Sequence, residues 1–119
     1  MNYHCEVLLV LSKDPELDLA IQKYETIETA EGEGSVKERL ASIFRESSEE
    51  DGWYEWRDSC IEWREDSEDE AWVMALLLWL ESQGMYSKFQ LLVIGEYFDE
   101  VSDMGGLDAY SITRSFSKN

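Results

Sequence analysis

The segment from residue 46 to residue 70 constrains the possible folds more than any other part of the chain. It holds twelve Asp and Glu residues, two arginines and three tryptophans. Charge runs of this kind are usually solvated faces, whereas closely spaced tryptophans usually fill a core because their side chains are large and mostly apolar. The segment therefore has to present a solvated face and a buried face within a short length of chain.

The acidic excess extends to the whole chain and excludes several classes of function. The 119 residues include 27 acidic and 10 basic side chains, which gives a formal net charge of −17. Direct binding to nucleic acid needs positive charge to displace the counterions around phosphate, so it is excluded, and docking on an anionic membrane is opposed for the same reason. With 44% hydrophobic residues the chain is too apolar for a disordered acidic tail. We expect one domain spanning residues 1–119.

Capping signals predict three helices. Each start has a capping residue followed by a helix-favouring partner, and these pairs are Asp14 with Pro15, Ser35 with Glu38, and Ser67 with Glu70. The third helix contains the longest apolar run, residues 71–80, which is about half of the ~20 residues needed to cross a bilayer. Gly84 is expected to end it.

Apolar runs predict strands at residues 4–11, 88–98 and 109–116. In the last run, Tyr110, Ile112 and Phe116 are expected to share one face. Polar or glycine-containing stretches predict loops, and these are residues 31–34, 47–52 and the surroundings of 105–106. The order of elements predicts an α+β fold, a small antiparallel (mixed) sheet with helices packed on one face.

The tryptophan segment itself is ambiguous between helix and strand. Trp53, Trp56, Cys60 and Trp63 follow one another at spacings of 3, 4 and 3, which is helical periodicity. Tryptophan and tyrosine also favour strands. We predict a short helix over residues 53–59 that passes into a short strand near residues 61–65.

Three short motifs resemble a known family. They are Asn2-Tyr3-His4-Cys5 before an apolar strand, Gly52 to Arg57 with Trp63 six residues on, and Glu96 to Glu100 before Gly105-Gly106. Together they resemble the YubB/Api92-like ferredoxin-like proteins of phages and plasmids. The chain lacks that family's Trp-Gly-Thr-Lys-Trp turn and its paired prolines. The resemblance implies a ferredoxin-like variant of the α+β fold and a mobile-element origin, and it provides no catalytic residues.

Residues suited to catalysis or metal binding are scarce in the sequence. His4 is the single histidine, and Cys5 and Cys60 are not arranged as a CxxC pair, so we expect two reduced, buried cysteines and no zinc site. Acids at positions 99, 100, 103 and 108 offer oxygen ligands for calcium but lack the spacing of an EF-hand. We expect no enzyme activity, no metal and no cofactor. The N-terminus shows no signal-peptide pattern, which favours the cytoplasm of a bacterial host.

An acidic band with aromatic side chains suits a partner with a basic groove, because carboxylates pair with arginine and tryptophan faces attract cations. Basic grooves normally hold DNA or RNA. We therefore expect an acidic phage or mobile-element protein that inhibits a basic host protein, such as a CRISPR or restriction factor, by occupying its nucleic-acid-binding surface. The expected partner-binding residues are Glu49, Glu50, Asp51, Trp53, Tyr54, Glu55, Asp58, Glu62, Glu65, Asp66, Glu68 and Asp69.

A second hypothesis makes the chain a small non-enzymatic assembly or regulatory module, for which an oligomer is possible. It would bind another protein, or itself, through an exposed sheet edge or through Tyr86, Phe89, Tyr97 and Phe98. The two hypotheses differ in their expected response to salt, because screening weakens the first kind of contact and not the second.

Overall fold

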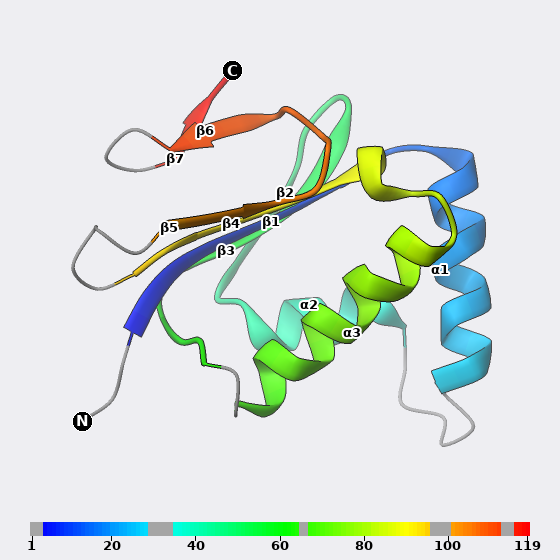
Figure 1. Cartoon of the computed structure of the whole chain (residues 1–119), viewed down its shortest axis with the longest axis horizontal. Helices are drawn as coiled ribbons and strands as arrows, with labels where there is room; N and C mark the ends of the chain where they lie inside the picture. The colour runs from blue at the N-terminus through cyan, green and yellow to red at the C-terminus, as the bar shows by residue number, and fades with distance from the viewer. Residues whose placement is uncertain (1–3, 29–34, 65–66, 96–100, 113–115) are drawn as a thin grey trace.

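The computed structural model describes residues 4–28, 35–64, 67–95, 101–112 and 116–119. These described residues form three α-helices, one 3-10 helix and seven strands (Figure 1). In chain order they are β1 (His4–Ser12), α1 (Pro15–Glu28), α2 (Val36–Ile43), β2 (Glu46–Glu49), β3 (Trp53–Glu62), α3 (Glu68–Ser82), η1 (Tyr86–Lys88), β4 (Phe89–Ile94), β5 (Val101–Met104), β6 (Tyr110–Ile112) and β7 (Phe116–Lys118).

The main sheet has five strands in the order β2-β3-β1-β4-β5, and every neighbouring pair is antiparallel. The three α-helices lie on one face of this sheet, and the small β6–β7 hairpin lies on the other (Figure 1). The predicted α+β class is confirmed. The β2–β3 hairpin and the helical crossovers that flank it give the strand order of a ferredoxin-like fold, extended by β5 and by the second hairpin.

The central strand β1 explains why the sheet needs cover on both faces. Its residues from Val7 to Leu11 are almost all fully buried. Val7, Leu9 and Leu11 belong to the large core under the helices, whereas Leu8 and Val10 belong to a second core under the β6–β7 hairpin. Alternate side chains of a strand point to opposite faces, so a continuous apolar run such as this one stays dry only between two layers.

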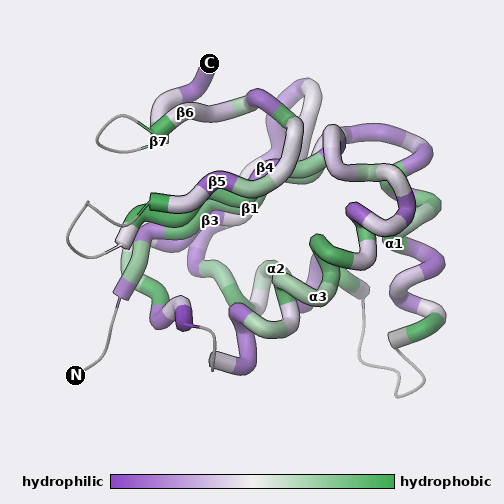
Figure 2. Tube along the Cα trace, viewed as in Figure 1, coloured by the Kyte–Doolittle hydropathy of each residue, from purple (hydrophilic) through white to green (hydrophobic). Residues whose placement is uncertain are grey.

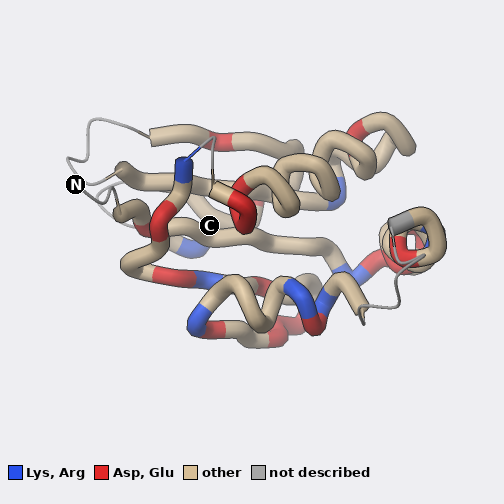
Figure 3. The backbone as a smooth tube through the Cα atoms, turned by 90° about the horizontal axis from the view of Figure 1, so that it is seen from below, with Lys and Arg blue, Asp and Glu red and all other residues tan. Residues whose placement is uncertain are grey.

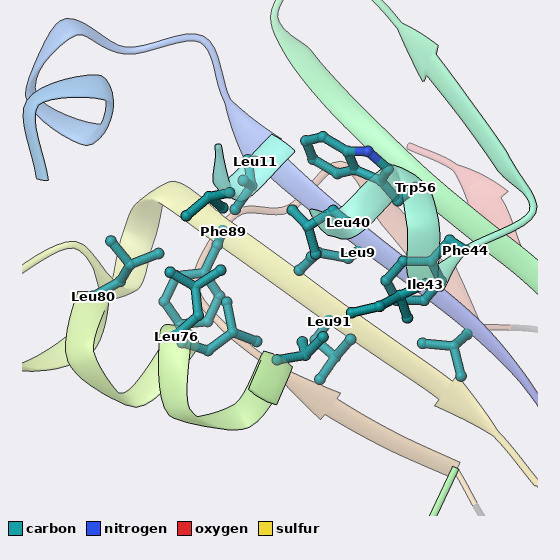
Figure 4. Packing of buried hydrophobic residues seen from close by; sticks show 14 of the residues in the cluster. Leu9, Leu11, Leu40, Ile43, Phe44, Trp56, Leu76, Leu80, Phe89 and Leu91 are labelled. Atoms are coloured by element: carbon teal, nitrogen blue, oxygen red, sulfur yellow. The ribbon is translucent and has the colours of Figure 1, made fainter. Parts of the chain in front are cut away.

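The helix-side core is built from all three helices and the central strands (Figures 2 and 4). Phe89 lies at its centre with no exposed surface, and Leu40, Leu76 and Leu80 close over it and its neighbours from α2 and α3. Gly105 follows β5 with a φ of +100°, and a side chain there would place its Cβ 2.1 Å from the carbonyl oxygen of Phe89. Glycine therefore permits both the backbone conformation and the close approach.

The predicted helix caps are confirmed. The Asp14 carboxylate accepts a hydrogen bond from the backbone N–H of Glu16 at 2.8 Å, and Ser35 and Ser67 each accept one from the third residue onward. Gly84 has a φ of +78° just after α3, as its predicted role at the helix end requires. The Lys88 ammonium also donates to Asp14 at 2.7 Å, which lowers the pKa of the Asp14 carboxyl and ties η1 to the start of α1.

The prediction of a helix over residues 53–59 is wrong, because this segment is part of the single long strand β3. Trp56 and Trp63 are seven residues apart and would face opposite sides of a regular strand, yet both lie in the helix-side core. The pairing of β1 with β3 contains a bulge, and the Asp58 carboxylate accepts from the N–H of Cys60 at 3.0 Å in this region. The inserted residue produces the helix-like spacing and leaves Cys60 exposed, contrary to the prediction that it is buried.

The boundaries of other strands also differ from prediction. The predicted loop at residues 47–52 includes most of β2, and β5 precedes Gly105 where a loop was expected. Of the predicted strand over residues 88–98, β4 covers Phe89–Ile94, and residues 96–98 lie outside the described part of the chain. The last predicted strand is a hairpin, β6 with β7, although Tyr110, Ile112 and Phe116 do share one core as expected. These short edge strands are rich in Ser and acidic residues, so pairing with a neighbour decides their structure more than propensity does.

Candidate functional site

Strand β2 forms an edge of the main sheet and begins the acidic segment. All four of its residues are exposed, and β3 is the only strand that pairs with it among the described residues. Its partners in β3 place Glu46 opposite Arg57 and Glu49 opposite Tyr54. Successive side chains alternate, so the two carboxylates face opposite sides of the sheet.

The turn after β2 is less negative than the sequence suggests, because two lysines from distant parts of the chain reach it. Lys13 forms an ion pair with Glu49 at 3.3 Å, and Lys118 forms one with Glu50 at 3.1 Å. Asp51 is exposed beside them. These pairings had no local signal in the sequence, since they join residues that only the fold brings together.

Glu55, one of the predicted partner-binding residues, is turned inward. Tyr110 donates a hydrogen bond to its carboxylate at 2.6 Å, the indole of Trp53 donates at 3.0 Å, and Ser48 donates at 2.9 Å. Burial raises the pKa of the Glu55 carboxyl, but these three hydrogen bonds and the charge of Arg57 outweigh burial and hold the pKa below its ordinary value of 4.5. Glu55 therefore links three elements of the fold, β2, β3 and the β6–β7 hairpin.

The same arrangement perturbs Tyr110. Burial and the negative charge of Glu55 raise the pKa of the Tyr110 hydroxyl to about 12. Tyr110 is also fixed through its backbone, because the buried side chain of Gln90 accepts from the N–H of Tyr110 at 3.0 Å and donates to its carbonyl at 2.9 Å. Together, Glu55, Gln90 and Tyr110 form a polar cluster whose hydrogen bonds hold the hairpin against the sheet.

Asp58, a second predicted partner-binding residue, is also buried. Its carboxylate accepts hydrogen bonds from the backbone N–H groups of Arg45 and Cys60 at 3.2 and 3.0 Å. It thus holds the entry to β2 and the bulge of β3. Like Glu55, it is committed to internal contacts and offers no carboxylate to a partner.

The remaining predicted acids gather where β3 leads into α3. Glu62 is exposed and pairs with Arg64 at 3.0 Å, Glu68 is exposed, and Asp69 is half-buried. Glu65 and Asp66 lie outside the described residues. Residues 62–70 contain six acids and one arginine in sequence. Figure 3 shows the acidic first turn of α3 with the β3 end of the sheet nearby.

The two predicted aromatic anchors are half-buried. Trp53 lies edge-on to the ring of Tyr110 at 6.2 Å between centroids, and the ammonium of Lys118 lies 5.7 Å from its ring. Tyr54 has the ammonium of Lys37 at 3.9 Å from its ring centroid. Each ring therefore already has a cation of this chain beside it.

Two shallow depressions flank β2, one on each side of the sheet. One has a volume of about 310 Å³ and is lined by Glu46, Ser47, Ser48, Glu55 and Arg57. The other has a volume of about 320 Å³ and is lined by Lys37, Ala41, Ser47, Ser48, Glu49, Tyr54 and Trp56. Ser47 and Ser48 line both, so the edge strand is the ridge between them.

The described residues contain no group of three or more His, Cys, Asp or Glu side chains that could hold a metal ion. Asp103 and Asp108 are exposed, whereas Asp99 and Glu100 lie outside the described residues.

The aromatic residues of the second hypothesis also differ in their exposure. Tyr86 is exposed, Tyr97 and Phe98 lie outside the described part of the chain, and Phe89 is fully buried, so its predicted availability to a partner is wrong.

None of the helices in the described part of the chain is long and apolar enough to cross a membrane. Comparisons with protein-family models, with curated proteins and with solved structures found no match to this chain. The resemblance to YubB/Api92-like proteins therefore stays a prediction.

Proposed function

We propose that this protein is a non-catalytic, acidic binding protein that occupies the positively charged nucleic-acid-binding surface of a bacterial host protein and thereby inhibits it. The observation that carries the proposal is the concentration of acids over residues 62–70, six against one arginine, at the junction of β3 and α3. An anti-defence role in the host cytoplasm, for a protein of phage or mobile-element origin, follows from the same idea.

The size of the charge supports a role in binding. Solubility of a small domain requires a net charge of only about 2–8 in magnitude. The chain carries −17, and the excess opposes folding because like charges repel one another in the compact state. A positively charged partner would relieve this repulsion and would be attracted over a longer range than apolar contacts allow.

The geometry favours electrostatic steering over imitation of a phosphate backbone. The turn after β2 and the β3–α3 junction lie at opposite ends of β3, whose ten residues span roughly 33 Å. Duplex DNA of that length carries roughly 19 charges. The protein offers two smaller acidic regions with a stretch between them where Glu55 and Asp58 are buried. The proposed interface therefore consists of Glu49, Glu50 and Asp51 in the first region and Glu62, Glu68 and Asp69 in the second.

A capture experiment followed by a competition assay tests the proposal. Proteins from a bacterial lysate are captured at low and at moderate salt, and each captured protein is purified. Its binding to a labelled DNA or RNA duplex is then measured as this protein is added. We expect a captured nucleic-acid-binding protein that loses its duplex, with an affinity that falls as salt rises.

A pair of variants with equal net charge separates a localised site from general acidity. Glu62→Gln/Glu68→Gln/Asp69→Asn removes three acids from the junction, and Glu16→Gln/Asp18→Asn/Asp103→Asn removes three exposed acids elsewhere. Each triple changes two acids in the first turn of a helix and one on a strand. The junction triple should weaken capture about tenfold and the control less than about twofold. Equal weakening by both triples, or binding that salt does not change, would contradict the proposal.

The second hypothesis, a non-enzymatic assembly or regulatory module, is favoured by one observation. The exposed β2 edge has a depression on each side, which is the arrangement that an added strand from another protein would fill. Binding of that kind would resist salt and would survive the junction triple.

A further inference from the structure

Helix α3 has an unusual composition for a helix on the surface. Residues 71–80 are ten consecutive apolar residues, so no polar side chain interrupts them on any side of the helix. The inward side is explained by the core, because Val73, Leu76, Leu77 and Leu80 have no exposed surface. A helix that is apolar all round is normally buried all round.

The outward side of α3 is not buried. Ala71, Ala75 and Leu78 are exposed and follow one another at spacings of four and three, so they form one stripe along the helix. Leu78 is 54% exposed. Trp72 and Trp79 border the stripe and are half-buried, Trp72 beneath the guanidinium of Arg39 at 5.2 Å and Trp79 against Tyr24. Single exposed leucines are common, but an uninterrupted stripe bordered by two indoles marks a contact surface.

The charges at the ends of the stripe indicate what covers it. Glu68 and Asp69 precede the stripe, Glu81 follows it, and α3 contains no Lys or Arg. In Figure 3, α3 is uncharged between these acidic ends. A second copy would bring acids against acids whether the two helices ran parallel or antiparallel, and each copy carries −17. An anionic lipid surface is repelled for the same reason.

We propose that this stripe, defined as Ala71, Ala75, Leu78 and the borders Trp72 and Trp79, docks an amphipathic helix of another protein whose apolar face is flanked by Lys or Arg at both ends. The two alanines let the partner's backbone approach closely, Leu78 inserts between its apolar side chains, and the acidic ends pair with its basic ends. The surface uses apolar contacts of α3, so it stands even if the acidic inhibitor proposal fails.

Binding of synthetic helical peptides to the full chain tests the proposal. The probe is a labelled peptide with leucines along one face and lysines at both ends, and its binding is followed by fluorescence anisotropy. Two control peptides have the same composition in scrambled order, or glutamates in place of the lysines. We expect the probe to bind at least about tenfold more tightly than either control.

Two leucines of similar exposure provide matched protein variants. Leu78→Gln changes the stripe, and Leu19→Gln changes a residue that is 58% exposed on α1. Both side chains are exposed, so both variants should keep the circular dichroism spectrum and unfolding midpoint of the parent. Leu78→Gln should weaken probe binding about tenfold, with Ala75→Gln acting in the same direction, whereas Leu19→Gln should leave it unchanged.

Three results would overturn the proposal. Equal weakening by Leu78→Gln and Leu19→Gln would mean that the stripe is not the site. Equal binding of the scrambled peptide would mean that the lysines alone bind to an acidic protein. A dimer of the unliganded protein in sedimentation, lost in Leu78→Gln, would identify a second copy as the occupant.

Discussion

The two faces of the main sheet are covered in different ways. The helix face packs a large apolar core in which side chains from α1, α2 and α3 meet those of β1, β3 and β4. The opposite face packs a small apolar core beneath the β6–β7 hairpin, and here a polar cluster of Glu55, Gln90 and Tyr110 provides the fastening. The difference shows that a short hairpin with little apolar area needs directional hydrogen bonds to hold one position.

The largest expected effect comes from truncating neighbouring residues that face the two sides. Leu8 and Leu9 are both fully buried, Leu8 under the hairpin and Leu9 under the helices. Leu9→Ala should lower the free energy of unfolding by about 4 kcal/mol and Leu8→Ala by about 2.5 kcal/mol, because the hairpin can settle into the cavity more easily than three helices can. Urea unfolding of both variants measures this. A larger loss for Leu8→Ala would show that the two faces have been ranked in the wrong order.

A smaller loss of stability is expected from a substitution in the polar cluster, and its size should depend on pH. The folded pKa of Glu55 lies below its ordinary value of 4.5, so its ionised form contributes stability above that pH, and the contribution is lost as pH falls through the folded pKa. Glu55→Gln should cost about 1 kcal/mol at pH 7, since hydrogen bonds to a charged acceptor contribute more than those to a neutral amide, and the cost should shrink in acid. Unfolding at several pH values tests this, with Asp103→Asn as an exposed control that should change little. A cost that persists in acid would contradict the assignment.

At alkaline pH the same cluster should report through Tyr110. Its pKa is raised to about 12 from 10.0, so the folded state holds the proton more tightly than the unfolded state does. Stability is therefore complete below pH 10 and is lost as pH rises toward 12. Ultraviolet titration should show one tyrosinate that forms late, and Tyr110→Phe should remove it. Late ionisation that survives in Tyr110→Phe would belong to another tyrosine.

The smallest expected effect is a difference in thiol reactivity. It distinguishes a covered part of the sheet from an uncovered part without altering stability. Cys5 is buried in the helix-side core, whereas Cys60 lies on β3, belongs to neither core and is exposed. A thiol reagent should therefore modify Cys60 in the folded protein and Cys5 only after unfolding. Mass spectrometry of the labelled chain identifies the site. Rapid labelling of Cys5 in the folded state would show that the helix face opens readily.

The sequence correctly predicted the features of the fold that depend on residues close together in the chain. The caps at Asp14, Ser35 and Ser67 and the helix end at Gly84 depend on residues within a few positions, and all are present. The bulge near Cys60 depends on how β1 and β3 register with each other. A seven-residue separation of two buried tryptophans looks helical in sequence, and it becomes compatible with a strand only once the extra residue is known.

The candidate site was predicted less well for a related reason. The composition of residues 46–70 identified the acidic segment, but the role of each acid in it depends on residues that are distant in sequence. Glu55 accepts a hydrogen bond from Tyr110, which lies near the far end of the chain, and Glu49 pairs with Lys13, which follows β1. The outward stripe of α3 did have a sequence signal, because residues 71–80 contain no polar residue. Such a run normally indicates burial on all sides, so the exposed side became visible only in the structure.

The hairpin that closes the second face also has a consequence for the lifetime of the protein in a cell. If β6 and β7 detach together, the strands beneath them present Leu8, Val10, Leu92 and Ile94 side by side as a bare aliphatic surface while the helix side stays intact. Such a partly opened form is what chaperones and proteases recognise. The rate of degradation would then depend on the hydrogen bonds of one carboxylate, Glu55, and one amide, Gln90, and not on global unfolding.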